Sequence, residues 1–145
     1  YYNDQLVSVM TFSHGNISRG GNPSDRSTYE LSRFCSDNRY RVIGIASKLF
    51  NHFIKNYDVS SVYSYADLRY SNGNLYKKLG MKYIGDNIPN YFYTDTNNRY
   101  NRFNFRKDVL VKKGYDPSKT EHQIMLERNY YRIYDTGNMK FIYTS

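Results

Sequence analysis

The change from a strand pattern to a helix pattern at Gly44 constrains this chain more than any other feature of its sequence. Polar and apolar residues alternate imperfectly over 28–36, which predicts a strand with Leu31 and Cys35 on one face and Glu30, Ser32 and Phe34 on the other. The apolar residues that follow recur at helical spacing. They predict a helix over 42–56 with an apolar stripe of Ile43, Ala46, Phe50, Phe53 and Ile54.

This turn is a candidate anion site. A strand that enters a helix through a glycine leaves backbone N–H groups facing the turn, and the helix dipole favours negative charge there. Gly44 and the small Ala46 would let a phosphate approach the backbone closely. The residues predicted to hold it are Arg41, Val42, Ile43, Gly44, Ile45 and Ala46.

Strands and helices continue to alternate after this helix. Residues 59–65 predict a second central strand, a short helix carries Tyr76, and residues 81–84 predict a third strand. We therefore expect 1–145 to form a single α/β domain, with a mixed, mostly antiparallel sheet of six or seven strands and a central helix on one face. Because the chain lacks an initiator Met and opens within a strand pattern, we expect the domain to be excised from a longer protein.

Two motifs in this stretch carry a family resemblance. Arg41-x-x-Gly44-x-Ala46 resembles the pyrophosphate-binding loop of the GNAT acyltransferases, and Asn74 to Met81 resembles the second signature of that family. A narrower pattern is similar to the Mom-like branch of bacteriophage DNA-modifying proteins. It consists of Ser64-Tyr65-Ala66-Asp67, Gly73, Leu75-Tyr76 and Tyr83-x-Gly85. The resemblance covers residues 29–85.

The resemblance implies a GNAT-like fold in which the strands at 28–36 and 61–66 splay apart, with the reactive arm of the cofactor between them. It implies an acyl-CoA donor, acetyl-CoA or a related thioester, whose pyrophosphate lies at Arg41–Ala46. The Mom-like branch implies that the acceptor is the amine of adenine in DNA. It also implies a phage protein that acts in the cytoplasm of the bacterial host.

Three residues are candidates for catalysis. Glu30 stands within a predicted central strand, where a charge must be paired or face a site, and it could accept the proton of the amine. Asp67 stands at the carboxyl end of the next strand, where functional groups of open sheets collect, although a turn role is equally open. Tyr76 matches the tyrosine that protonates the leaving thiolate in many GNAT enzymes, and packing of its helix is the alternative.

The net charge of +8 and the pI near 9.5 are compatible with an anionic partner or with a basic surface that has none. Residues 100–111 predict a strand with Phe103 and Phe105 buried and Arg102, Asn104 and Arg106 exposed, either to phosphates or simply to solvent. The candidate DNA contacts are Arg33, Arg69, Ser71, Asn72, Arg102 and Arg106.

The last part of the sequence predicts a helix and a hairpin. Thr120 and Gln123 form a capping box, which predicts a helix over 121–128. Residues 130–134 and 139–143 predict a hairpin. The three histidines stand on different predicted elements, so we expect no metal site.

Two other functions fit these patterns. The chain could be a catalytically inactive GNAT-like module that directs a phage nuclease to DNA, or an N-acetyltransferase for small amines or proteins. The sequence has no signal peptide and no apolar run long enough to cross a membrane, so we expect a cytoplasmic protein without a membrane partner.

Overall fold

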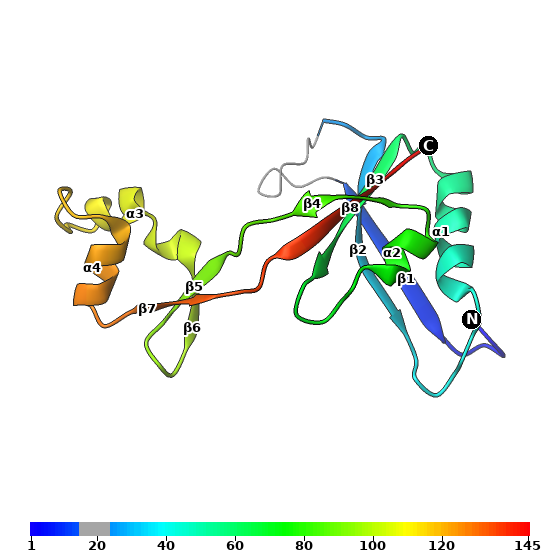
Figure 1. Ribbon diagram of the computed structural model, residues 1–145, viewed down its shortest axis with the longest axis horizontal. Coiled ribbons are helices and arrows are strands. Elements are labelled where there is room, and N and C mark those ends of the chain that lie inside the picture. Colours follow the sequence, from blue (N-terminus) through cyan, green and yellow to red (C-terminus); the bar gives the residue numbers. More distant parts are fainter. Residues whose placement is uncertain (15–23) are drawn as a thin grey trace. The chain divides into compact units, whose positions relative to one another are not determined.

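The computed structural model describes residues 1–14 and 24–145, and they form two compact units (Figure 1). The first unit comprises Tyr1–Asn87 and Asn138–Ser145, and the second unit comprises Ile88–Gly137. The backbone N–H of Asn87 donates to the carbonyl oxygen of Asn138 at 2.8 Å. The chain therefore leaves the first unit and returns to it at adjacent positions.

A mixed sheet of five strands is the basis of the first unit. The strands lie in the order β1 (Ser8–His14), β2 (Thr28–Ser36), β3 (Ser61–Asp67), β8 (Asn138–Thr144) and β4 (Lys82–Asp86). Within this sheet β2 and β3 pair in parallel, and every other neighbouring pair is antiparallel. The predicted α/β class with a mixed, mostly antiparallel sheet is confirmed. The sheet has fewer strands than expected because β5, β6 and β7 form a sheet of their own.

Helix α1 (Ile45–Asn56) packs its apolar stripe onto this sheet, and the short helix α2 (Asn74–Lys78) follows β3. Phe50 and Phe53 of α1 are buried. The buried core around them consists of Leu31, Val59, Val62, Ala66, Leu79, Met81 and Phe141. Burying an apolar side chain of this size contributes roughly 1.5–3 kcal/mol, so these contacts hold α1 against the sheet.

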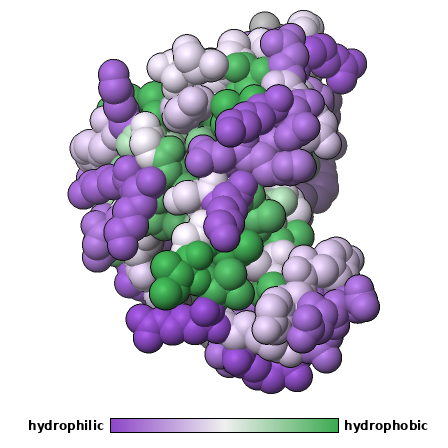
Figure 2. Space-filling view, turned by 90° about the vertical axis from the view of Figure 1, so that its right-hand side faces the viewer, coloured by the Kyte–Doolittle hydropathy of each residue, from purple (hydrophilic) through white to green (hydrophobic). Residues whose placement is uncertain are grey.

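The predicted start of the helix was wrong. Gly44 has a left-handed backbone (φ 72°) and is the N-cap, so α1 begins at Ile45 rather than at residue 42. Ile43 therefore precedes the helix and is 86% exposed instead of belonging to its apolar stripe. The side of the first unit on which α1 lies shows hydrophobic patches between hydrophilic side chains (Figure 2).

A bulge interrupts β2 at Ser32. Thr11 pairs with Arg33 and Phe12 pairs with Leu31, so Ser32 is skipped in the register of β1 and β2. The extra residue changes which side chains share a face. Cys35 is exposed although it was predicted to share the face of the buried Leu31. The predicted alternation holds only before the bulge.

The second unit has a three-stranded antiparallel sheet with helical segments. Its strands lie in the order β6 (Arg99–Asn101), β5 (Tyr91–Thr94) and β7 (Tyr131–Tyr134). The helical segments are the 3-10 helix η2 (Arg102–Phe105), α3 (Lys107–Lys112) and α4 (Glu121–Glu127). The capping box at Thr120 and Gln123 is confirmed at the start of α4. The buried core consists of Tyr93, Phe105, Leu110, Ile124 and Met125.

The predicted strand over 100–111 was wrong. The Asn101 side chain accepts a hydrogen bond from the Phe103 backbone N–H at 3.0 Å and caps η2, which ends the strand after three residues. Phe105 is buried as predicted, but Phe103 is 50% exposed and Arg102 is half-buried. The local hydrogen bond of Asn101 competes with a strand, and alternation alone could not reveal this.

The predicted hairpin over 130–143 was also wrong. Strand β7 pairs with β5 in the second unit, whereas β8 lies between β3 and β4 in the first. Asp135, between the two strands, accepts hydrogen bonds from the backbone N–H groups of Asn90 and Gly137. These bonds lie within the second unit and give the residues after β7 a local structure other than a hairpin turn. None of the helices formed by the described residues is long and apolar enough to cross a bilayer.

Candidate functional site

The parallel strands β2 and β3 pair only over their first three residue pairs. The last pair is Glu30 with Tyr63, although β2 continues to Ser36 and β3 to Asp67. The Ser64 hydroxyl donates to the Leu31 carbonyl oxygen at 2.8 Å, directly after the last pair. The bulge at Ser32 lies where β2 leaves its partner. We refer to residues 31–36 and 64–67 as the diverging strand ends.

Glu30 is a buried carboxylate at the start of this divergence. Glu30 is only 5% exposed, and the Tyr63 hydroxyl donates to its Oε2 at 3.5 Å. A buried carboxylate requires hydrogen bonds or a positive partner. Lys140 of β8 lies 5.6 Å from the centre of the Tyr63 ring and 5.7 Å from that of Tyr65. The carboxylate therefore belongs to a face of the sheet that also carries tyrosine hydroxyls and an amine.

Tyr76 of α2 reaches the diverging strand ends. Its hydroxyl donates to the backbone carbonyl oxygen of Tyr65 at 3.1 Å, two residues beyond the last β2–β3 pair. Its ring stacks on Phe141, with 5.0 Å between ring centres and 17° between planes. The packing of the helix thus fixes the ring, and the hydroxyl lies at the part of β3 that β2 no longer covers.

Asp67 shapes the turn that follows β3. Its Oδ1 accepts a hydrogen bond from the Arg69 backbone N–H at 2.8 Å, and its carbonyl oxygen accepts from the backbone N–H groups of Tyr70 and Ser71. The Arg69 guanidinium donates to the Tyr70 hydroxyl at 3.2 Å. These contacts give Asp67 the geometry of a turn carboxylate at the carboxyl end of a strand.

Gly73 is the N-cap of α2. It has a left-handed backbone (φ 74°), and a Cβ atom there would lie 2.3 Å from Cζ of Phe141. Ser71 Oγ and Asn72 Oδ1 instead accept from the backbone N–H groups of Gly73 and Asn74. Both side chains are therefore occupied in shaping the turn that brings Tyr76 to β3.

The start of α1 is open. Arg41, Val42, Ile43 and Gly44 are exposed. Among the described residues no side chain caps the helix, and apart from its chain neighbours no atom lies within 4 Å of a Cβ built on Gly44. The first turn of a helix presents backbone N–H groups that can donate hydrogen bonds to an anion.

Among the candidate DNA contacts, Arg33 is exposed on β2, while Arg102 and Arg106 belong to the second unit.

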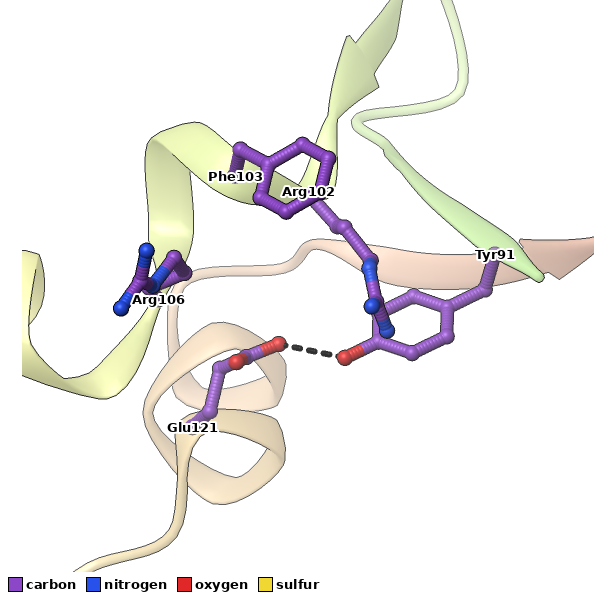
Figure 3. Close-up of a pocket in the computed structure, with 5 residues that line it drawn as sticks. All are labelled: Tyr91, Arg102, Phe103, Arg106 and Glu121. Atoms are coloured by element: carbon purple, nitrogen blue, oxygen red, sulfur yellow. Dashed lines mark hydrogen bonds between the residues drawn. The ribbon is translucent and has the colours of Figure 1, made fainter. Parts of the chain in front are cut away.

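The second unit contains a pocket of about 180 Å³ (Figure 3). Only two of its lining residues were among the predicted site residues. It is lined by Tyr91, Arg102, Phe103, Arg106 and Glu121, which we call the α4 pocket. Arg102 and Arg106 were candidates as members of one strand face. The 3-10 helix η2 and its C-cap position them instead. Tyr91 and Glu121 were not predicted, because nothing local in the sequence connects β5 with α4.

Glu121 is the centre of a hydrogen-bond network in this pocket. The hydroxyls of Tyr91 and Tyr93 both donate to its Oε1, at 2.7 and 2.9 Å, and a guanidinium nitrogen of Arg132 lies 3.7 Å from the same oxygen. Burial raises the pKa of Tyr93 to about 12. The hydrogen bond from Arg132 opposes this shift, and the bond to Glu121 adds to it. Burial and the bond to Glu121 also raise the pKa of Tyr91. Both hydroxyls therefore remain donors at neutral pH.

No protein-family model matches this sequence, and none of the curated proteins matches it either. Among residues 1–14 and 24–145, no three His, Cys, Asp or Glu side chains gather as metal ligands. Among the described residues, chemically useful groups come together at the diverging strand ends and in the α4 pocket.

Proposed function

We propose that the first unit is a GNAT-type N-acyltransferase of the Mom-like kind, with an acyl-CoA donor such as acetyl-CoA and the amine of adenine in DNA as acceptor. One observation carries the proposal: the parallel strands β2 and β3 stop pairing after Glu30 and Tyr63, directly beside Tyr65, to which Tyr76 donates. The resemblance implies that the cofactor's reactive arm lies between these two strands. Backbone groups of strand ends that no longer pair with each other could bind that arm.

The order of the elements supports the same proposal. A bulged strand, an open glycine turn, a helix, a parallel strand and a short helix follow one another from β2 to α2. The α1 N-terminus would hold the pyrophosphate through the backbone N–H groups at Gly44, Ile45 and Ala46, and the exposed Arg41 would add a positive charge.

The proposed reaction is a direct transfer. The amine nitrogen attacks the thioester carbonyl carbon, a C–N bond forms, and the C–S bond breaks. Glu30 accepts the amine proton, directly or through a water molecule, and Tyr76 donates its proton to the leaving thiolate. Solvent then returns the proton from Glu30 to the Tyr76 phenolate. Asp67 positions the turn between β3 and α2 in this scheme.

The test is the nucleoside composition of DNA from cells that express the chain, measured by mass spectrometry. An adenine derivative that carries an acyl group, and that disappears in Tyr76→Phe, is the expected result. If a small amine or a protein is acylated while the DNA stays unmodified, the acceptor is that amine or protein and not DNA. CoA binding without any acylated product would overturn the enzymatic proposal.

A non-catalytic DNA-binding module is the second candidate. It is favoured by the bond between the Tyr76 hydroxyl and the Tyr65 carbonyl, since a hydroxyl with a backbone partner can serve packing alone. In that case Tyr76→Phe retains the DNA affinity of the wild type, and no modified nucleoside is found with either protein.

A further inference from the structure

The α4 pocket combines one carboxylate, two guanidinium groups and two aromatic rings in a small space (Figure 3). We propose that it binds a nucleotide whose base carries an exocyclic amine, with the base in the pocket and the phosphate at its arginines. The inference extends the nucleic-acid acceptor of the proposed function, but it does not depend on acyl transfer.

The carboxylate provides the selective contact. Glu121 Oε1 accepts from two tyrosine hydroxyls, while Oε2 has no hydrogen-bond partner among the residues that the structure describes. An ionised carboxylate only accepts hydrogen bonds, and each of its oxygens has two lone pairs. Adenine, cytosine and guanine offer an exocyclic amine to such an oxygen, whereas thymine offers a carbonyl oxygen in the corresponding place. Glu121 Oε2 would therefore favour the bases that carry an amine.

The charge of the pocket favours an anionic ligand. Arg132 and the two hydroxyls compensate the charge of Glu121, which leaves Arg102 and Arg106 to meet a phosphate. Arg106 is paired with Asp108 at 3.2 Å, but both side chains are more than half exposed. Exposed ion pairs contribute little, so a phosphate could take the place of Asp108 through a bidentate contact with the guanidinium.

The aromatic residues favour a planar ligand. Phe103 is 50% exposed, and the Arg102 guanidinium lies 5.5 Å from the centre of its ring and 5.0 Å from that of Tyr91. Exposed aromatic rings and arginine planes stack on nucleobases. In Figure 3 the Arg102 side chain extends over the Tyr91 ring, while the Arg106 guanidinium points away from Tyr91. The volume of about 180 Å³ is below the roughly 300–1,000 Å³ of sites for drug-sized ligands, which suits a base with its sugar and phosphate outside.

The experiment measures binding to the full chain at low salt. Calorimetry compares dAMP with dTMP, and fluorescence anisotropy compares labelled oligodeoxyadenylate with oligothymidylate of equal length. The expected result is a preference for adenine of roughly tenfold, about the effect of one hydrogen bond to a charged group. Tighter binding of the oligonucleotide than of dAMP assigns the site to a nucleic-acid strand, and comparable affinities assign it to free nucleotides.

Two variants test the contacts. Glu121→Gln keeps an oxygen for Tyr91 and Tyr93 but places an amide N–H₂ where Oε2 was, so the preference for adenine should vanish or reverse. Arg106→Ala should lower the affinity for the adenine ligands and for the thymine ligands by a similar factor. Lys113→Ala removes one exposed charge from the same unit outside the pocket and should have a smaller effect than Arg106→Ala. Circular dichroism melting of each variant controls for folding.

Several outcomes would overturn the assignment. They are no binding by the wild type, equal binding of the adenine and thymine ligands, and equal effects of Arg106→Ala and Lys113→Ala. Different outcomes would refute the proposed acyltransferase function. Selective nucleotide binding without acyl-CoA binding would refute the acyltransferase and keep the pocket, whereas acyl transfer to DNA without selective nucleotide binding would refute the pocket alone.

Discussion

Glu30 and Tyr63 form the last residue pair of the parallel β2–β3 ladder, and the Tyr63 hydroxyl donates to the Glu30 carboxylate at 3.5 Å. The backbone pairing and the polar side-chain contact therefore end at the same place. Beyond it the β2–β3 ladder ends: the Ser64 hydroxyl donates to the Leu31 carbonyl oxygen, and Tyr76 donates to the carbonyl oxygen of Tyr65. This combination is the structural basis of the acyltransferase proposal and of the predictions that follow.

Replacing Tyr76 by Phe should lower turnover by roughly 10²–10⁴, the usual contribution of one acid–base group. The ring retains its stacking on Phe141, and the variant loses one hydrogen bond, worth about 1 kcal/mol of unfolding free energy. Modified-nucleoside yield measures the first effect and chemical denaturation the second. Wild-type yield from the variant would exclude Tyr76 as the acid.

Replacing Gly44 by Asp should weaken CoA binding at least tenfold, or about 1.4 kcal/mol, because a negative charge would stand where the pyrophosphate is proposed to lie. Gly44→Asn is the matched control, since Asn and Asp both tolerate a left-handed backbone and differ in charge. Apart from the chain neighbours, no atom of the part of the chain that the structure describes lies within 4 Å of a Cβ at this position, so either side chain fits. Isothermal titration calorimetry with CoA should show the Asp variant binding more weakly than the Asn variant, and equal affinities would move the pyrophosphate elsewhere.

Replacing Gly73 by Ala should destabilise the protein more than replacing Gly44 by Ala. Both glycines have left-handed backbones, which cost a residue with a side chain roughly 1–2 kcal/mol. At Gly73 the added Cβ would also lie 2.3 Å from Cζ of Phe141, and overpacking of this kind costs typically about 1–3 kcal/mol more. Urea denaturation of the two variants provides the comparison. Equal losses of stability would show that the Phe141 ring moves aside without loss of unfolding free energy.

Replacing Tyr100 by Phe should raise the pKa of Asp95, which is lowered to about 2 first by the Tyr100 hydroxyl and then by the Asn98 backbone N–H. A lowered carboxyl pKa stabilises the folded state above the unfolded value of 3.8, and this stabilisation is lost as the pH falls towards about 2. The variant should therefore lose less stability between these pH values. NMR titration of the carboxyl group measures the pKa. Asp37, whose pKa is lowered to about 2 by Arg39, should not change.

Much of the first unit, and helix α4 of the second unit, could be predicted because their signals are local. Alternation revealed β2 and β3, helical spacing revealed α1 to within three residues of its start, and the capping box at Thr120 revealed α4. Each of these signals depends on neighbours within one or two turns of the chain. Where a local hydrogen bond competed with a periodic pattern, as at Asn101, the pattern gave the wrong element.

The sequence by itself determined the α/β class, the glycine turn before α1 and the positions of Glu30, Asp67 and Tyr76 on their elements. Only the tertiary structure decided that β7 and β8 join different sheets, that β2 and β3 separate after Glu30, and that Glu121 accepts from Tyr91 and Tyr93. These features depend on strand pairing and side-chain contacts between residues about 30 or more positions apart in the sequence. Their energies depend on which surfaces meet after folding, and no local pattern of residues encodes that choice.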